Sequence, residues 1–104
     1  MSLLQPIRGR VPVDPTDPVR LAEATRRLCA ELLAHNRLGP GDVVAARFVG
    51  GVALPGSPVP AARAAGWSGI PLFFTRAASA GDVLEVEAHV RLRRRRRLRP
   101  LELS

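Results

Sequence analysis

Two periodic patterns of apolar and polar residues divide the chain between strand and helix. In residues 83–93 the pattern has a period of two, which is typical of a β-strand with one buried face. The apolar side chains share one face of such a strand and the polar ones the other: Val83 or Leu84, Val86, Ala88, Val90 and Leu92 against Glu85, Glu87, His89, Arg91 and Arg93. This segment therefore predicts a long strand that turns its charged side chains away from the core.

The second pattern has the period of an α-helix and runs from about Val19 to His35. Apolar residues recur at helical spacing and form one stripe: Leu21, Ala24, Leu28 and Leu32. The ends carry the usual signals, with Thr16 or Asp17 as a cap and Pro18 in the first turn, and with stop residues at Asn36, Gly39 and Pro40. We therefore expect a helix that packs one face against a sheet.

The remaining elements are shorter and are separated by proline and glycine. Further strands are predicted at Leu3–Arg8, Asp42–Val49, Ile70–Thr75 and Leu98–Leu103, and a short helix at Pro58–Ala65. The order strand, helix, strand, helix and then three strands predicts an α/β fold, a mixed sheet with the helices on one face. The 104 residues are enough for a single domain, residues 1–104, with one modest core.

Composition narrows the class of protein. Hydrophobic residues make up 46% and charged residues 24%, and no stretch is apolar enough to cross a bilayer, so a globular protein of the cytoplasm is expected. The single cysteine, Cys29, excludes an intrachain disulfide and falls among apolar positions of the predicted helix. We expect it in the core rather than as a nucleophile, and no metal site is expected.

The net charge of +7 comes from one segment. All sixteen basic residues are arginine, and seven of them lie between residues 91 and 99, where no acid occurs. A basic tract on a neutral remainder raises the question of nucleic acid. However, no aromatic residue interrupts Arg93–Arg97 and the tract falls on predicted strands and a turn, so a solvated arginine-rich hairpin is the expected explanation.

Arg8 is the first candidate for an anion-binding residue. Leu3, Leu4 and Ile7 precede it in an apolar strand, so its guanidinium is expected to be buried at the strand end. A buried charge must be paired or must hold an anion, and the planar guanidinium suits a carboxylate or phosphate. The alternative is a partly exposed arginine that pairs with a nearby carboxylate.

Several segments together carry a family resemblance. The residues Ile7-Arg8-Gly9, the segment "LLAHNRLGPGDVV", the segment "SPVPAARAAGWSGIPL" and the end "LRPLELS" follow one another in the order found in AroH-class chorismate mutases. The chain therefore resembles that family over nearly its whole length. The resemblance implies a homotrimer of small α/β domains in a barrel-like assembly, with active sites in clefts between subunits. The reaction implied is the rearrangement of chorismate to prephenate, which needs no metal or cofactor.

The resemblance also implies roles for individual residues. Arg8 matches the arginine of the first strand, which contacts substrate, and Arg63 matches the helix arginine that assists carboxylate binding. The arginine that meets the ether oxygen aligns without gaps to His89, but a two-residue insertion would place Arg91 there. Both residues lie on the same face of the strand, so alternation cannot choose between them.

Other family positions have changed. Ser57 and Pro60 replace a phenylalanine and a lysine, Ala77 replaces the glutamate that grips the substrate hydroxyl, and Glu102 replaces a tyrosine. Phe73-Phe74 replaces Thr-Cys and predicts a drier, bulkier pocket, although at least one of the two rings is expected to pack in the core because neighbours on a strand face opposite sides. Glu102 could pair with Arg8 or Arg91, or act as a general acid or base.

Three hypotheses for function follow. The first is an AroH-like enzyme, either a weak chorismate mutase or one repurposed for another small carboxylated cyclic substrate. Its candidate catalytic residues are Arg8, His89, Arg91 and Glu102, and its candidate substrate-binding residues are Ser57, Arg63, Phe73 and Phe74. The second is a non-catalytic trimer that binds a ligand or a partner protein. The third, a nucleic-acid-binding module, is the least expected.

Overall fold

The computed structural model describes residues 2–104 and contains five strands and two α-helices. In chain order these are β1 (Leu3–Pro12), α1 (Pro18–His35), β2 (Val43–Gly50), α2 (Val59–Ala64), β3 (Leu72–Arg76), β4 (Val83–Leu92) and β5 (Leu101–Glu102). Single 3-10 turns lie at Pro40–Asp42 and Ala78–Ala80. The predicted order of helices and strands is therefore confirmed.

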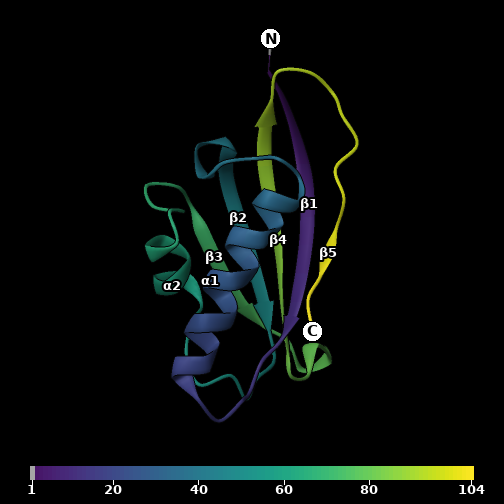
Figure 1. The fold of residues 1–104 in the computed structure, drawn as a ribbon. Coiled ribbons are helices and arrows are strands. Elements are labelled where there is room, and N and C mark those ends of the chain that lie inside the picture. The colour runs from purple at the N-terminus through teal and green to yellow at the C-terminus, as the bar shows by residue number, and fades with distance from the viewer. Residues whose placement is uncertain (1) are drawn as a thin grey trace.

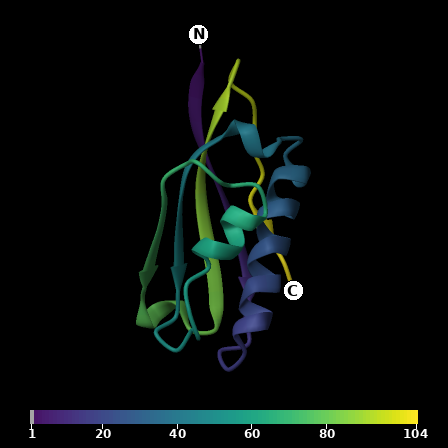
Figure 2. The ribbon, with the colours of Figure 1, turned by 90° about the vertical axis from the view of Figure 1, so that its left-hand side faces the viewer.

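The strands form one mixed sheet in the order β3-β2-β4-β1-β5. β4 pairs antiparallel with β1 and with β2, whereas β3 is parallel to β2 and β5 is parallel to β1. Both helices lie on the same side of the sheet (Figures 1 and 2). The expected fold class, a mixed α/β sheet with helices on one face, is confirmed.

The local sequence explains how α1 begins and which way it faces. The side chain of the cap residue Asp17 accepts a hydrogen bond from the Val19 N–H at 2.9 Å, and Pro18 occupies the first turn, where its missing N–H is not needed. One stripe of the helix is buried: Leu21, Thr25, Leu28, Cys29, Leu32 and Leu33. α1 therefore packs along the sheet through the face that its apolar spacing predicts.

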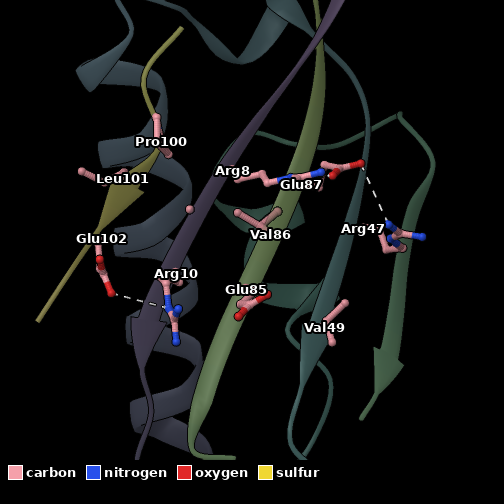
Figure 3. A pocket seen from close by; sticks show the side chains of 11 residues that line it. Arg8, Arg10, Arg47, Val49, Glu85, Val86, Glu87, Pro100, Leu101 and Glu102 are labelled. Atoms are coloured by element: carbon pink, nitrogen blue, oxygen red, sulfur yellow. Dashed lines mark hydrogen bonds and ion pairs between the residues drawn. The ribbon is translucent and has the colours of Figure 1, made fainter. Parts of the chain in front are cut away.

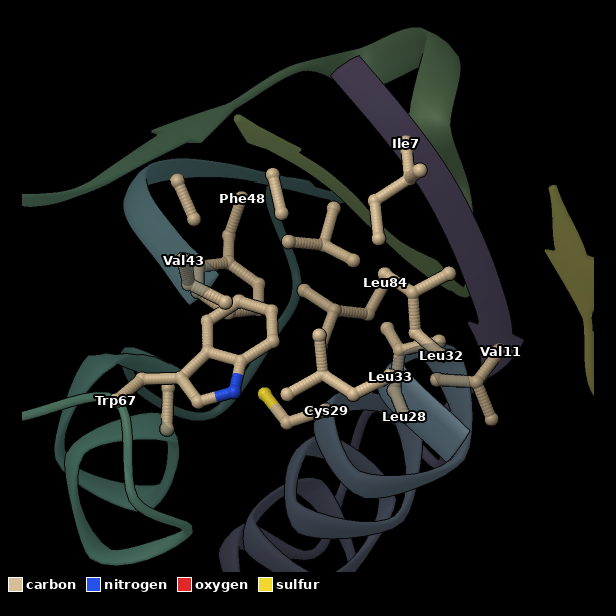
Figure 4. Close-up of a cluster of buried hydrophobic side chains, with 14 of the residues drawn as sticks. Ile7, Val11, Leu28, Cys29, Leu32, Leu33, Val43, Phe48, Trp67 and Leu84 are labelled. Carbon is tan, nitrogen blue, oxygen red and sulfur yellow. The ribbon is translucent and has the colours of Figure 1, made fainter. Parts of the chain in front are cut away.

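The core lies between the helices and the inward face of the sheet (Figure 4). Phe48 of β2 and Trp67, which follows α2, are almost completely buried, and their ring centroids lie 6.2 Å apart. The Trp67 indole points toward Cys29 of α1. Burial raises the pKa of the Cys29 thiol to about 12, so this side chain stays a neutral core thiol near pH 7, as the sequence predicts.

β1 is longer than predicted. It continues to Pro12 instead of ending at Arg8, because residues 9–12 stay paired with residues 83–86 of β4. Gly9 is the first residue beyond the predicted end of the strand. It stands on the inward face under α1, where a Cβ atom would come within 3.0 Å of Leu28 Cδ1. The close approach of the helix, and not the end of the strand, therefore explains this glycine.

The predicted last strand, Leu98–Leu103, shrinks to the two residues of β5, while other boundaries differ by one or two residues. β1 lies between β4 and β5, so the connecting residues 93–100 pass the start of β1 and run back along its far side (Figure 1). The expected arginine-rich hairpin is therefore wrong. β5 pairs with β1 rather than with β4, and the local sequence pattern carries no information about this pairing.

Candidate active site

The sheet face that points away from the helices carries many charged side chains. We call it the open face, and by strand alternation and register it consists of Leu4, Pro6, Arg8, Arg10, Arg47, Val49, Phe73, Glu85, Glu87, His89 and Arg91. One row crosses four strands, with Phe73 beside Arg47, Arg47 beside Glu87, and Glu87 beside Arg8. Since neighbouring strands lie about 4.8 Å apart, these side chains are close enough to interact.

Glu87 is the centre of this row (Figure 3). Its carboxylate accepts a hydrogen bond from Arg8 Nε at 2.8 Å and lies 3.3 Å from His89 Nε2 and 3.9 Å from Arg47 Nη2. The Arg8 guanidinium lowers the pKa of the Glu87 carboxyl, partial burial opposes this, and His89 and Arg47 lower the pKa further. One carboxylate therefore holds three cationic or ionisable nitrogen groups around it.

The expectation of a buried Arg8 at a strand end is wrong. Arg8 lies in the middle of β1, and its side chain is 75% exposed on the open face. Strand alternation explains this, because Ile7 and Gly9 occupy the inward face on either side of it. The alternative interpretation fits better: an exposed arginine that pairs with a nearby carboxylate.

A depression of about 500 Å³ lies on the open face beside Arg8. It is lined by residues of β1, β2, β4 and β5 and by Pro100, which precedes β5: Arg8, Gly9, Arg10, Arg47, Val49, Glu85, Val86, Glu87, Pro100, Leu101 and Glu102. Glu102 reaches it from β5, with its Oε1 3.8 Å from Arg10 Nε (Figure 3). Glu102 thus lies in the same depression as Arg8, but the arginine that it pairs with is Arg10.

His89 and Arg91 differ in their neighbours. Both lie on the open face, as alternation predicts, but only His89 contacts the Arg8–Glu87 pair through its Nε2 atom. Arg91 stands one step further along β4, opposite Leu4, and borders a separate surface with Asp42. Of these two candidates, His89 is therefore the one that lies beside the Arg8–Glu87 pair within one chain.

The two phenylalanines of β3 face opposite sides, as expected for neighbours on a strand. Phe74 packs against the core and lies under the Arg76 guanidinium, whose central carbon is 5.2 Å from the ring centroid. Phe73 is 59% exposed on the open face beside Arg47. Phe73 is thus available to a ligand or another chain, whereas Phe74 belongs to the packing of the domain.

Ser57 and Arg63 lie apart from Arg8. Ser57 Oγ accepts the Val59 N–H at 3.1 Å at the start of α2, and Arg63 Nη1 donates to the Ile70 carbonyl at 3.2 Å. α2 covers the helix side of the sheet, so a single chain does not bring Arg63 to the open face (Figure 2). The candidate residues of the sequence therefore divide into two groups on opposite sides of the sheet.

Comparison with known proteins decides the family. The family model described as "Chorismate mutase type I" matches residues 4–100, which is nearly the whole chain. The chain belongs to the type I chorismate mutase family. Among solved structures, the chorismate mutase from Clostridium thermocellum, Cth-682, superposes with a TM-score of 0.85 at 22% identity, over 95% of this chain and 94% of that one. That likeness shows the same fold.

Three further searches found nothing. A search of curated proteins gives no match. Among residues 2–104, no three His, Cys, Asp or Glu side chains gather in a way that could hold a metal ion. No helix in that range is long and apolar enough to cross a membrane.

Sequence reasoning missed two residues of this chorismate mutase family member. Glu87 was placed on the polar side of β4 but was not a site candidate, and Arg47 of β2 was not singled out. Glu87 precedes His89 by two residues and therefore shares its face, which was a usable signal. No such signal pointed to Arg47, because only the pairing of β2 with β4 brings it beside Glu87.

The pKa of Glu87 gives a direct test of this ion cluster. We expect carbon-13 NMR of the side-chain carboxyls to show Glu87 titrating below an ordinary glutamate, and Arg8→Ala to raise its pKa toward the usual value. Because the folded pKa lies below the unfolded one, the stability that Glu87 contributes is present above about pH 4.3 and is lost as the pH falls through its folded pKa. Arg20→Ala on α1 is the control and leaves Glu87 unchanged. A Glu87 pKa at or above the ordinary value contradicts the cluster.

Proposed function

We propose that this family member is a homotrimeric isomerase of weak chorismate mutase activity, with its sites between neighbouring copies. The substrate class is a small cyclic dicarboxylate, chorismate itself or a related molecule that rearranges in the same way. The reaction breaks one carbon–oxygen bond and forms one carbon–carbon bond within the substrate. The protein's task is then to hold the compact conformer and to stabilise the charge on the ether oxygen.

The observation that carries this proposal is the separation of the candidate cations. Arg8 and His89 lie together on the open face, while Arg63 lies on α2 on the helix side. One chain therefore presents half of a site for a molecule with two carboxylates. A second copy that brings its α2 edge to the open face of the first would supply the other half.

The exposed apolar residues of the open face support assembly. Leu4 and Phe73 are each 59% exposed on a face that both helices leave bare. Exposed apolar residues within a broad surface favour contact with another protein surface. An assembly of three copies with their open faces turned inward would bury these residues, as the barrel-like trimer implied by the resemblance requires.

Within such a site, the chain's own residues have separate tasks. Arg8 binds a substrate carboxylate or the ether region through its planar guanidinium, and Arg63 of the neighbouring copy holds the second carboxylate. His89 or Arg91 supplies the cation near the ether oxygen. Ala77 offers no carboxylate to the substrate hydroxyl, and losing one preorganised contact of this kind costs about 10²–10³ in rate. We therefore expect the enzyme to catalyse the rearrangement slowly.

Glu87 sets an electrostatic limit on this site. A substrate carboxylate that binds Arg8 has to share or displace the Glu87 carboxylate, which already accepts from Arg8 Nε at 2.8 Å. This competition weakens the binding of any anion. It also favours one form of the second candidate function, a non-catalytic trimer that binds a partner protein, because an Arg8 neutralised by Glu87 then has a purely structural role on the open face.

Two measurements on the pure protein test the proposal. We expect chorismate's diene absorbance to fall faster than in buffer, and light scattering to give the mass of a trimer. A flat trace at high protein concentration leaves the non-catalytic trimer. A monomer removes the shared site on which the activity depends.

A complementation experiment tests whether two copies share one site. Arg8→Ala and Arg63→Ala are each expected to be nearly inactive alone. When the two variants are expressed together, mixed trimers contain some sites in which an intact Arg8 faces an intact Arg63, and activity returns. No recovery in mixed trimers would contradict a site built from Arg8 of one copy and Arg63 of another.

A further inference from the structure

The connection between β4 and β5 forms a basic surface that the proposed function does not use. We call it the arginine belt, and it consists of the exposed Arg93, Arg94, Arg95, Arg97 and Arg99 together with His35 and Arg37 at the end of α1. Among residues 2–104, the ion pairs that form involve none of these side chains. Their charge is therefore not neutralised within the chain.

The backbone of the belt is fixed although its side chains are exposed. Asn36, which is buried at the end of α1, accepts the Arg99 N–H at 2.6 Å and donates to the Arg99 carbonyl at 2.9 Å and to the Leu32 carbonyl at 3.0 Å. Gln5 of β1 holds Arg96 in the same way, donating to its carbonyl at 3.0 Å and accepting its N–H at 3.3 Å. Side chains that project from an ordered backbone lose less entropy when they bind.

Arg96 is not counted in the belt because its guanidinium has a structural role beside it. Its Nη2 donates to the Asn36 carbonyl and, at 3.4 Å, to the Arg37 carbonyl, two backbone oxygens that directly follow the last turn of α1. A guanidinium at this end of a helix offsets the negative pole of the helix dipole. Arg96 therefore removes the local repulsion that an anion would otherwise meet, in a cavity of about 300 Å³ lined by His35, Asn36, Arg37, Arg96, Arg97 and Arg99.

The residue types of the belt indicate which class of partner it can bind. Stable protein–protein contacts depend on buried apolar or aromatic anchors, and the belt offers none, since Leu98 packs toward the core. Single-stranded nucleic acid is bound largely by stacking on aromatic residues, which the belt also lacks. The phosphate backbone of a duplex needs only positive charge at ordered positions.

We propose that the arginine belt binds the phosphate backbone of double-stranded nucleic acid without reading its sequence. The sequence-based argument against this partner placed the tract on strands and a turn, and the structure removes that premise, because residues 93–100 form an exposed connection. The missing aromatic residues still argue against single strands. This binding is independent of the proposed isomerase activity.

Fluorescence anisotropy with labelled 20-base-pair DNA and RNA duplexes tests the proposal. We expect binding at about 50 mM salt that weakens steeply toward 200 mM, with a slope of log K against log salt near −0.9 for each phosphate contact on DNA. Arg94→Ser with Arg95→Ser removes two contacts and reduces the steepness of that slope by about 2 for each belt that touches the duplex. The DNA and RNA arms show which duplex is preferred.

The matched control removes the same charge elsewhere. Arg20→Ser with Arg26→Ser changes two exposed arginines of α1 and leaves the belt intact, so its salt slope should stay close to that of the unmodified protein. Equal losses in both double variants would show attraction by net charge alone and overturn the proposal. So would no binding to either duplex at 50 mM salt. Tighter binding to polyglutamate than to either duplex would overturn it in favour of an acidic protein partner.

Discussion

Arg8→Ala is expected to lower kcat/KM for chorismate by about 10²–10³-fold, the usual effect of removing one preorganised donor from an active site. Among the candidate residues, only Arg8 combines three features. The family resemblance implies that it is the first-strand arginine, it borders the depression of about 500 Å³, and its Nε donates to the Glu87 carboxylate at 2.8 Å. A methyl group in its place leaves Glu87 in the site without its main counterion, so an anionic substrate is also repelled.

The variants of Arg8 separate charge from geometry. Arg8→Lys keeps the charge but loses the planar pair of donors, so its kcat/KM should lie between those of the unmodified protein and Arg8→Ala. Arg20→Ala, on the helix side, is the matched control for loss of one exposed arginine and should leave the rate unchanged. Steady-state kinetics by the fall in chorismate absorbance measures all three. Equal rates in Arg8→Ala and the unmodified protein would remove Arg8 from the site.

Trp67→Ala is expected to lower the free energy of unfolding by about 3–5 kcal/mol, the range found when a large aromatic side chain is removed from a core. Trp67 is 1% exposed and packs on Phe48, with the ring centroids 6.2 Å apart. It also joins α2 to α1 and the sheet, because it follows α2 and points toward Cys29 (Figure 4). The small α2 helix, which carries Arg63, therefore depends on this indole for its position.

Urea unfolding followed by circular dichroism measures this effect. The protein concentration has to be the same for every variant, because assembly makes the apparent stability depend on it. Trp67→Phe should recover part of the loss, since a ring still fills part of the space. Val19→Ala, at a position 62% exposed on α1, should change the stability by no more than about 0.5 kcal/mol. A loss in Trp67→Ala no larger than that would contradict the core assignment.

Local patterns along the chain were sufficient for several features. The spacing of Leu21, Leu28 and Leu32 predicted the buried face of α1, and a cap at Thr16 or Asp17 followed by Pro18 predicted its start, where the structure has Asp17 as the cap. The alternation in residues 83–92 fixed which β4 side chains are buried, and it put His89 and Arg91 on one face. The family could be inferred as well, because its motifs are segments of contiguous sequence.

Errors arose where the structure depends on contacts between distant segments. Arg8 was expected to be buried because apolar residues precede it, but its exposure follows from the pairing of the whole of β1 with β4. The first strand was predicted to end at Arg8, but it continues through Gly9, where the approach of Leu28 of α1 leaves little room for a side chain. The tract near Arg96 was expected in a hairpin, but β5 pairs with β1, and Asn36 fixes the connection.

Local sequence is enough to predict the order of the elements, the inward faces of α1 and β4, and the family, because each depends on neighbours within a few residues of one another. It is the folded arrangement of the strands that brings Arg8, Arg47 and His89 around Glu87, puts Arg63 on the other side of the sheet and leaves the arginine belt exposed. Strand order and register set these relations. They are set by the burial of the whole core and by hydrogen bonds between segments near opposite ends of the chain, such as the one from the Leu103 N–H to the Arg10 carbonyl, which no local pattern records.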